Sequence, residues 1–146
     1  ILRPIIQRVV MGEPYKAGTE ATVFRALRIP FATPICFEIT DPDLVRRFRQ
    51  EGAELLLNLA NDSWFGPVGY SEMATDQVIF RAVENRVYVV RSSNSGISGV
   101  VDSFGNLLEG SDVEVLSPRT TTLYTRTGDY WLLGGLVLLI ILLRRR

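Results

Sequence analysis

The sequence contains no histidine, one cysteine and one lysine among its 146 residues. A single cysteine excludes an internal disulfide, and the lack of histidine removes the usual ligand set of a zinc site. Acidic and basic residues balance at 16 each, whereas nucleic-acid binding needs a positive field. We therefore expect no metal, no cofactor and no nucleic-acid partner, and a catalytic lysine would have to be Lys16.

The length corresponds to one domain at most, although a chain of this size can bury a real core. The first residue is Ile1, without an initiator methionine, and no secretory signal pattern follows it. We interpret the chain as a piece of a longer or processed protein.

An uncharged run rich in leucine, isoleucine and valine covers residues 130–143, and three arginines follow at 144–146. The run is shorter than the ~20 residues of a membrane-spanning helix. A run of this length is also typical of a buried core helix or an interfacial helix. However, it has no polar face, and Tyr130, Trp131 and the arginines suit the two headgroup regions. These features predict a transmembrane helix over 129–146 with cytoplasmic arginines, and residues 1–128 on the opposite side.

The rest of the chain alternates between strand and helix patterns. Asp41 and Pro42 predict a helix start, and Gly52 predicts its end. A second helix is expected over 71–85, with an apolar stripe of Met73, Val78, Ile79, Ala82 and Val83. Strands are expected over 31–36, 54–59, 87–91, 97–101 and 113–124, with a hairpin turn over 102–106 and a return strand at 107–108. This order predicts an α/β layered fold.

Cys36 ends one of these strands and lies a few residues before a helix, where open α/β sheets carry their chemistry. A lone cysteine is more often a small buried hydrophobe, so its neighbours decide between the two interpretations. Glu38 follows closely and is either a site carboxylate or the partner of an arginine such as Arg91. Because parallel strand ends lie at one edge of a sheet, we expect further polar and aromatic groups near Cys36: Asn58, Asn61, Asp62 and Trp64.

Four blocks resemble the nitrilase-like domain of the apolipoprotein N-acyltransferase family: PICFE at 34–38, NLANDSWFG at 58–66, FRAVENR at 80–86 and RSSNSGIS at 91–98. They occur in the family's order and approximate spacing, and the resemblance covers about residues 12–146. The second block separates this family from the soluble nitrilases and amidases. The resemblance implies part of a nitrilase-like layered α/β sandwich over 1–128, followed by one transmembrane helix.

The resemblance also implies a function. The family is a bacterial inner-membrane enzyme with an extracytoplasmic catalytic domain. It transfers a fatty acyl chain from a phospholipid to the N-terminal amine of a diacylglyceryl-cysteine apolipoprotein. Cys36 matches its nucleophile, which forms the acyl thioester, and Glu38 matches the glutamate that follows. Phe37 and Trp64 match positions expected at the substrate, although Trp64 is equally interpreted as a packing residue.

Some family features are missing from this sequence. The family's catalytic glutamate and lysine lie upstream of its cysteine, the lysine shortly before a Pro-Phe-Gly-Glu-like segment that this chain lacks. Lys16 lies instead in a stretch, residues 13–18, that resembles the approach to the nucleophile strand, and Phe37 replaces the usual tyrosine. The isolated chain is therefore expected to be inactive. A nitrilase-superfamily amidase or hydrolase and a catalytically incomplete membrane-anchored fragment are the alternatives.

Overall fold

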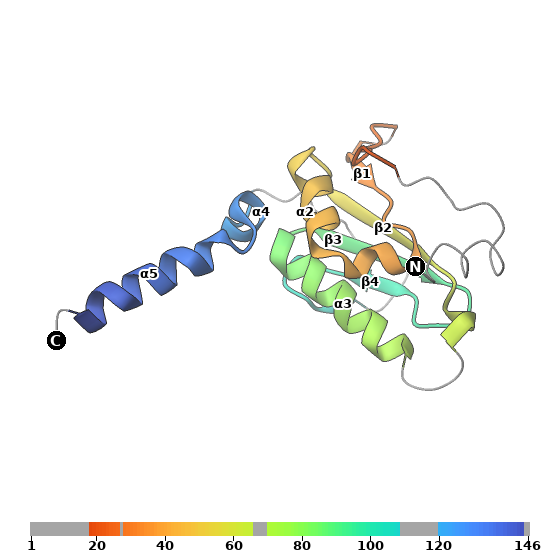
Figure 1. Cartoon of the computed structure of the whole chain (residues 1–146). Helices are drawn as coiled ribbons and strands as arrows, with labels where there is room; N and C mark the ends of the chain where they lie inside the picture. The colour runs from red at the N-terminus through yellow and green to blue at the C-terminus, as the bar shows by residue number, and fades with distance from the viewer. Residues whose placement is uncertain (1–17, 27, 66–69, 109–119, 145–146) are drawn as a thin grey trace, which may run out of the picture.

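The computed structural model describes residues 18–26, 28–65, 70–108 and 120–144, without the side chains of Trp64 and Phe65. Lys16 and residues 109–119 therefore lie outside the described part. Figure 1 shows a sheet with helices packed on it and a helical rod leaving it. In chain order the elements are β1 (Phe31–Ala32), η1 (Cys36–Thr40), α2 (Pro42–Gln50), β2 (Leu55–Ala60), η2 (Asp62–Phe65), α3 (Tyr70–Asn85), β3 (Tyr88–Ser93), β4 (Gly99–Val101), β5 (Leu107–Leu108), α4 (Leu123–Thr127) and α5 (Tyr130–Arg144).

The sheet has five strands in the order β1-β2-β3-β4-β5. β1, β2 and β3 are parallel, whereas β4 and β5 are antiparallel additions joined by a tight hairpin. Apolar strand residues such as Leu56 and Val89 are fully buried, together with Val45 of α2 and Val78 of α3. The core therefore lies between the sheet and these two helices, as a nitrilase-like α/β layer requires.

The start and end of α2 agree with the sequence prediction. The Asp41 carboxylate accepts hydrogen bonds from the backbone N–H groups of Asp43 and Leu44, each at 3.0 Å. Pro42 occupies the first turn, where its missing N–H costs nothing. Gly52 follows the helix with φ of +97°, a conformation that favours glycine.

Three predictions about elements need correction. The strand expected over 31–36 ends at Ala32, because Cys36 has a φ of +50° and begins η1 instead. On α3, Met73 and Val83 are exposed, since the buried face is centred on Ala74, Val78 and Ala82. The strand expected over 113–124 is wrong at its end: the Thr122 side chain accepts the N–H of Thr125 and so caps α4.

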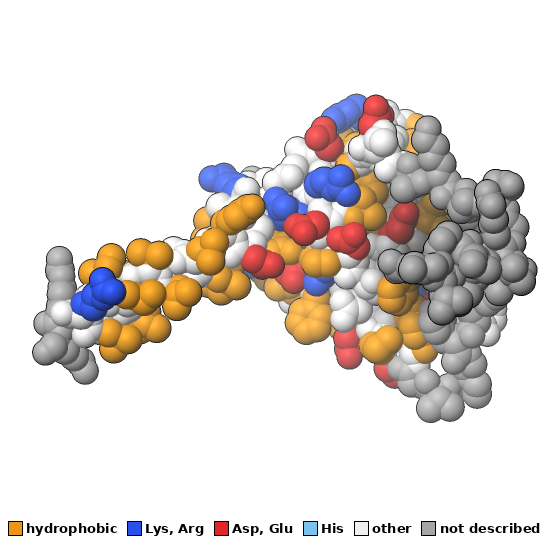
Figure 2. Space-filling model, viewed as in Figure 1, with side chains coloured by type: hydrophobic (Ala, Val, Ile, Leu, Met, Phe, Trp, Pro, Cys, Tyr) orange, Lys and Arg blue, Asp and Glu red, His pale blue; other side chains and the backbone are white. Residues whose placement is uncertain are grey.

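α5 projects from the domain as a rod whose apolar side chains face outward along its length (Figures 1 and 2). None of its residues from Tyr130 to Arg144 is buried. Of the helices in the described residues, none combines the length and the apolar content that crossing a bilayer requires. The helix expected over 129–146 therefore forms, and its membrane crossing stays a prediction.

Candidate active site

Cys36 lies at the first turn of η1, beside the carboxyl end of β2. Ile35 forms a parallel bridge with Leu59, which sets the approach of the two segments. The thiol is half-buried, and its Sγ lies 3.9 Å from the carbonyl oxygen of Asn61. A φ of +50° is uncommon for a residue other than glycine and costs about 1–3 kcal/mol. Surrounding contacts must therefore hold Cys36 in this turn.

Asn58 supplies those contacts from β2. Its side-chain amide is fully buried and donates to the carbonyl oxygens of Pro34, at 2.9 Å, and Cys36, at 3.2 Å. A guanidinium nitrogen of Arg91, on β3, donates to the other end of this amide. Because β2 and β3 pair Asn58 with Arg91 in register, the sheet itself sets the orientation of the amide.

The Arg91 side chain that contacts this amide also forms a buried ion pair with Asp62. Arg91 contacts both carboxylate oxygens of Asp62, at 2.7 and 3.0 Å, and the two side chains are 3% and 4% exposed. The Ser93 hydroxyl donates to the same carboxylate at 2.7 Å. A Cβ on Gly96 would lie 2.0 Å from an Asp62 oxygen, so only glycine fits there. One guanidinium nitrogen of Arg91 makes both contacts, and these charge-assisted hydrogen bonds, with that from Ser93, oppose the desolvation cost of the two charges.

Glu38 closes the turn around Cys36. Its carboxylate accepts the N–H of Ile35 at 2.7 Å, and its own N–H donates to the carbonyl oxygen of Ile35 at 3.0 Å. Glu38 is exposed and has no ion pair among the described residues, whereas Arg91 pairs with Asp62. The interpretation of Glu38 as the partner of Arg91 is therefore wrong.

Tyr70, which the sequence analysis did not single out, lies close to these groups at the start of α3. Burial raises the pKa of its hydroxyl, and the negative charges of Cys36 and Asp62 raise it further, while Arg91 opposes them. The hydroxyl is therefore protonated at neutral pH. No sequence motif marked Tyr70, because only the packing of α3 against the strand ends brings it here.

An open cleft of about 420 Å³ exposes Cys36 between the ends of β2 and β3. It has an apolar side formed by Ile35 and Leu59, which are 60% and 56% exposed. Phe37 is 57% exposed but does not line the cleft, and the Trp64 side chain lies outside the described part. The structure thus brings Asn58, Asn61 and Asp62 together around Cys36, as the strand ends predicted.

The structure thus has a cysteine beside the strand ends of a nitrilase-like α/β layer, and this arrangement indicates the class of protein. The profile of the carbon-nitrogen hydrolase family matches residues 4–122, and the chain belongs to this family. An amidase from a Nesterenkonia species shares the fold with a TM-score of 0.58 at 19% identity, over 83% of this chain and 49% of that chain.

Curated relatives identify the branch of the family that the chain resembles. The apolipoprotein N-acyltransferase 1 of Treponema denticola is 32% identical over 139 residues, which is 88% of this chain and 25% of that protein. The apolipoprotein N-acyltransferase of Geobacter metallireducens is 34% identical over 107 residues, 73% of this chain and 20% of that protein. The chain thus spans a quarter or less of these relatives.

Proposed function

We propose that this chain is part of an acyltransferase in which Cys36 carries a fatty acyl chain from a phospholipid to the N-terminal amine of a diacylglyceryl-cysteine apolipoprotein. The presentation of the Cys36 thiol in an open cleft, on a turn held by Asn58 and Glu38, carries this proposal. The names of the curated relatives support the choice of reaction.

The chemistry has two steps. The Cys36 thiol gives its proton to a base and attacks the ester carbonyl of the phospholipid, the ester C–O bond breaks, and the base returns this proton to the lysophospholipid alcohol that leaves. The acceptor amine then attacks the thioester, an amide forms, and the thiolate leaves as the amine gives up a proton. Thiolates suit both steps, because they are good nucleophiles and good leaving groups.

Three neighbours have proposed roles in these steps. The backbone N–H of Phe37, the residue after the proposed nucleophile, is proposed to stabilise the tetrahedral oxyanion, as donors next to nucleophiles commonly do. The Glu38 carboxylate holds the turn of the nucleophile and lies within two residues of it. Phe37 and Trp64 are proposed to contact the lipid substrate, and the 57% exposure of Phe37 leaves its ring available.

We further propose that α5 inserts into the bacterial inner membrane, with residues 1–128 on the extracytoplasmic side. Its apolar side chains are exposed, with aromatic residues at one end and Arg144 at the other. A helix of 15 residues is ~22 Å long against a ~30 Å hydrocarbon core. Insertion therefore depends on arginine side chains reaching the headgroups, or on local thinning.

Mass spectrometry of the full-length gene product tests the nucleophile. After incubation with phospholipid, we expect one fatty-acyl adduct on Cys36, which disappears when a diacylglyceryl-cysteine peptide is added. Cys36→Ser should form no adduct, because a serine hydroxyl is scarcely ionised at neutral pH, whereas Ser103→Ala, outside the cleft, should acylate normally. Acylation of the serine variant with continued transfer would refute the role of Cys36. Loss of the adduct to water alone would favour a hydrolase.

The same assay tests the isolated 146 residues, which we expect to form no adduct. A cysteine reacts as its thiolate, and enzymes that use one activate it with a neighbouring base or cation. The resemblance places the activating glutamate and lysine upstream of Cys36, outside the quarter of the relatives that this chain matches. A stoichiometric adduct on the isolated chain would contradict this expectation.

A further inference from the structure

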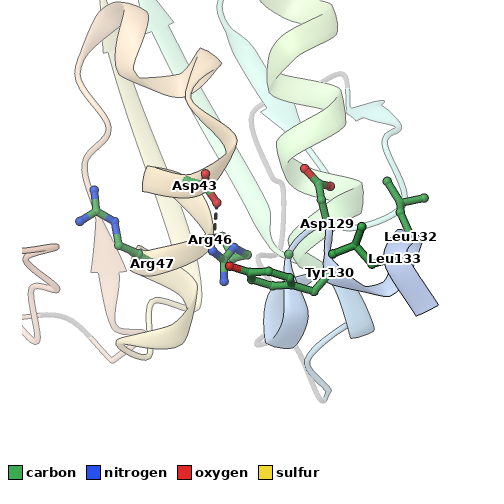
Figure 3. A pocket seen from close by; sticks show the side chains of 8 residues that line it. Asp43, Arg46, Arg47, Asp129, Tyr130, Leu132 and Leu133 are labelled. Atoms are coloured by element: carbon green, nitrogen blue, oxygen red, sulfur yellow. Dashed lines mark hydrogen bonds and ion pairs between the residues drawn. The ribbon is translucent and has the colours of Figure 1, made fainter. Parts of the chain in front are cut away.

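A second pocket, of about 650 Å³, lies where α5 joins the domain. It shares no lining residue with the Cys36 cleft. Residues of α2 form one side of the pocket, and the turn into α5 with the first residues of α5 forms the other (Figure 3). The pocket therefore lies between the domain and the apolar rod. The lining residues are Asp43, Arg46, Arg47, Gly128, Asp129, Tyr130, Leu132 and Leu133.

Arg46 is held in this pocket by its neighbours. It pairs with Asp43 at 2.9 Å, and its Nε is buried without a hydrogen-bond partner among the described groups. Gly128 has a φ of +57°, and a Cβ there would lie 3.2 Å from the guanidinium carbon. The turn between α4 and α5 therefore closes against Arg46, and Figure 3 shows the Tyr130 ring beside it.

Two further charges line the pocket without an ion pair in the described part of the chain: Arg47 and Asp129. Both residues are exposed. The lining thus holds two cations and two anions, with Asp43, Arg46 and Arg47 on α2 and Asp129 at the turn into α5. A ligand with one charge of each sign matches this lining better than an ion of a single sign.

The outer end of the pocket is apolar. Leu132 and Leu133 are 52% and 58% exposed and begin the apolar surface that continues along α5. A ligand with a charged head in the pocket can therefore extend a hydrocarbon chain along the rod. Tyr130, 76% exposed, lies at the boundary between the two regions, where amphipathic rings are favoured at membrane surfaces.

We propose that this pocket binds the headgroup of a bilayer phosphatidylethanolamine, with its phosphate at Arg46 and Arg47 and its ammonium at Asp43 and Asp129. One acyl chain then lies against Leu132 and Leu133. This site rests on the proposed insertion of α5, and it is separate from the acyl-donor site at Cys36. Its consequence is that one bound lipid fixes the angle between the domain and the membrane helix.

The carboxylates distinguish between lipid headgroups. The primary ammonium of phosphatidylethanolamine donates N–H hydrogen bonds to Asp43 and Asp129, whereas the quaternary ammonium of phosphatidylcholine has no N–H to donate. Phosphatidylglycerol has no cation and would face the two carboxylates unpaired. The order of affinity should therefore be phosphatidylethanolamine, then phosphatidylcholine, then phosphatidylglycerol.

Native mass spectrometry of the detergent-purified full-length gene product, titrated with each of these three lipids, tests the site. Asp129→Asn should weaken phosphatidylethanolamine binding about two- to fivefold, the size of an exposed charge pair, and weaken phosphatidylcholine binding less, because phosphatidylcholine loses the charge attraction but no hydrogen bond. Arg47→Gln should weaken both, because both carry the phosphate. Arg28→Gln and Asp76→Asn, exposed charges outside the pocket, are the matched controls.

Equal binding of the three lipids by the wild-type protein, or equal effects of Asp129→Asn and Asp76→Asn, would overturn the lipid site. Cysteine labelling after Arg146 in intact cells separates this result from a failure of the proposed function. Protection of this position together with equal binding of the three lipids refutes the site alone. Labelling of this position by an impermeant reagent refutes the insertion of α5, and the lipid site with it.

Discussion

Asn58 shows how one buried amide can set the geometry around a proposed nucleophile, Cys36. Its side chain joins the carbonyl oxygens of Pro34 and Cys36 to the guanidinium of Arg91. None of these groups is charged except Arg91, whose charge Asp62 neutralises. The amide therefore links the buried ion pair to the turn of Cys36 through hydrogen bonds, and it holds this turn in its strained conformation. This makes Asn58 a positioning residue for the proposed reaction.

Asn58→Ala in the full-length protein should lower the rate of thioester formation about 10–100-fold with little change in the half-saturating lipid concentration, because the thiol loses its orientation. It should also destabilise the fold by about 2–4 kcal/mol, since a buried donor of Arg91 loses its acceptor. Single-turnover mass spectrometry and urea unfolding measure the two effects. Asn106→Ala, which removes an exposed amide of the β4–β5 hairpin, is the control for the thioester rate. An unchanged thioester rate in Asn58→Ala would contradict the positioning role.

At the scale of elements, the hairpin between β4 and β5 depends on one carboxylate. Asp102 accepts the backbone N–H groups of Phe104, at 2.8 Å, and Asn106, at 2.9 Å, and the Asn106 side chain at 2.9 Å. Gly105 completes the turn with a φ of +90°. The sequence predicted this turn from the run of aspartate, serine, glycine and asparagine, whose local hydrogen bonds favour turns.

The pKa of Asp102 makes this hairpin sensitive to acid. Partial burial raises the pKa, but the hydrogen bonds from Asn106, Phe104 and Gly105 outweigh it and hold the pKa below its ordinary value of 3.8. A lowered pKa in the folded state stabilises the protein above pH 3.8, and this stabilisation is lost as the pH falls through the folded-state value. Asp102→Asn should remove this part of the acid dependence, measured as the urea midpoint between pH 6 and pH 3. An identical pH profile for the variant and the wild type would contradict it.

At the scale of the whole molecule, the apolar rod and the domain have opposite surface chemistry. Figure 2 shows apolar side chains around α5 and charged side chains on the domain beside its base. Such a rod has no partner among the described residues of this chain, and a bilayer is the environment we propose for it. The domain would then face the membrane with the end that carries α4 and the second pocket.

Cysteine labelling in intact cells tests this topology in a Cys36→Ser background. A cysteine placed after Arg146 should be protected from impermeant thiol reagents, and one near Gly105, at the exposed position of Phe104, should be labelled, because basic clusters stay in the cytoplasm. Lysed cells provide the control, in which both positions should react. Labelling of both positions in intact cells would exclude the spanning arrangement.

Local sequence signals determined much of this protein. Asp41, Pro42 and Gly52 defined α2, and the turn at 102–106 defined the hairpin, because caps and turns depend on hydrogen bonds between near neighbours. The motif around Cys36 singled out this residue as the candidate nucleophile, although the strand that it was expected to end stops at Ala32. Only the tertiary structure showed that Arg91 contacts Asp62 and Asn58 and that Glu38 accepts the N–H of Ile35. It also brought Tyr70 to the site, and it formed α4 where the end of a strand was expected. These contacts join residues from different elements, and their energies depend on burial and register that no local pattern contains.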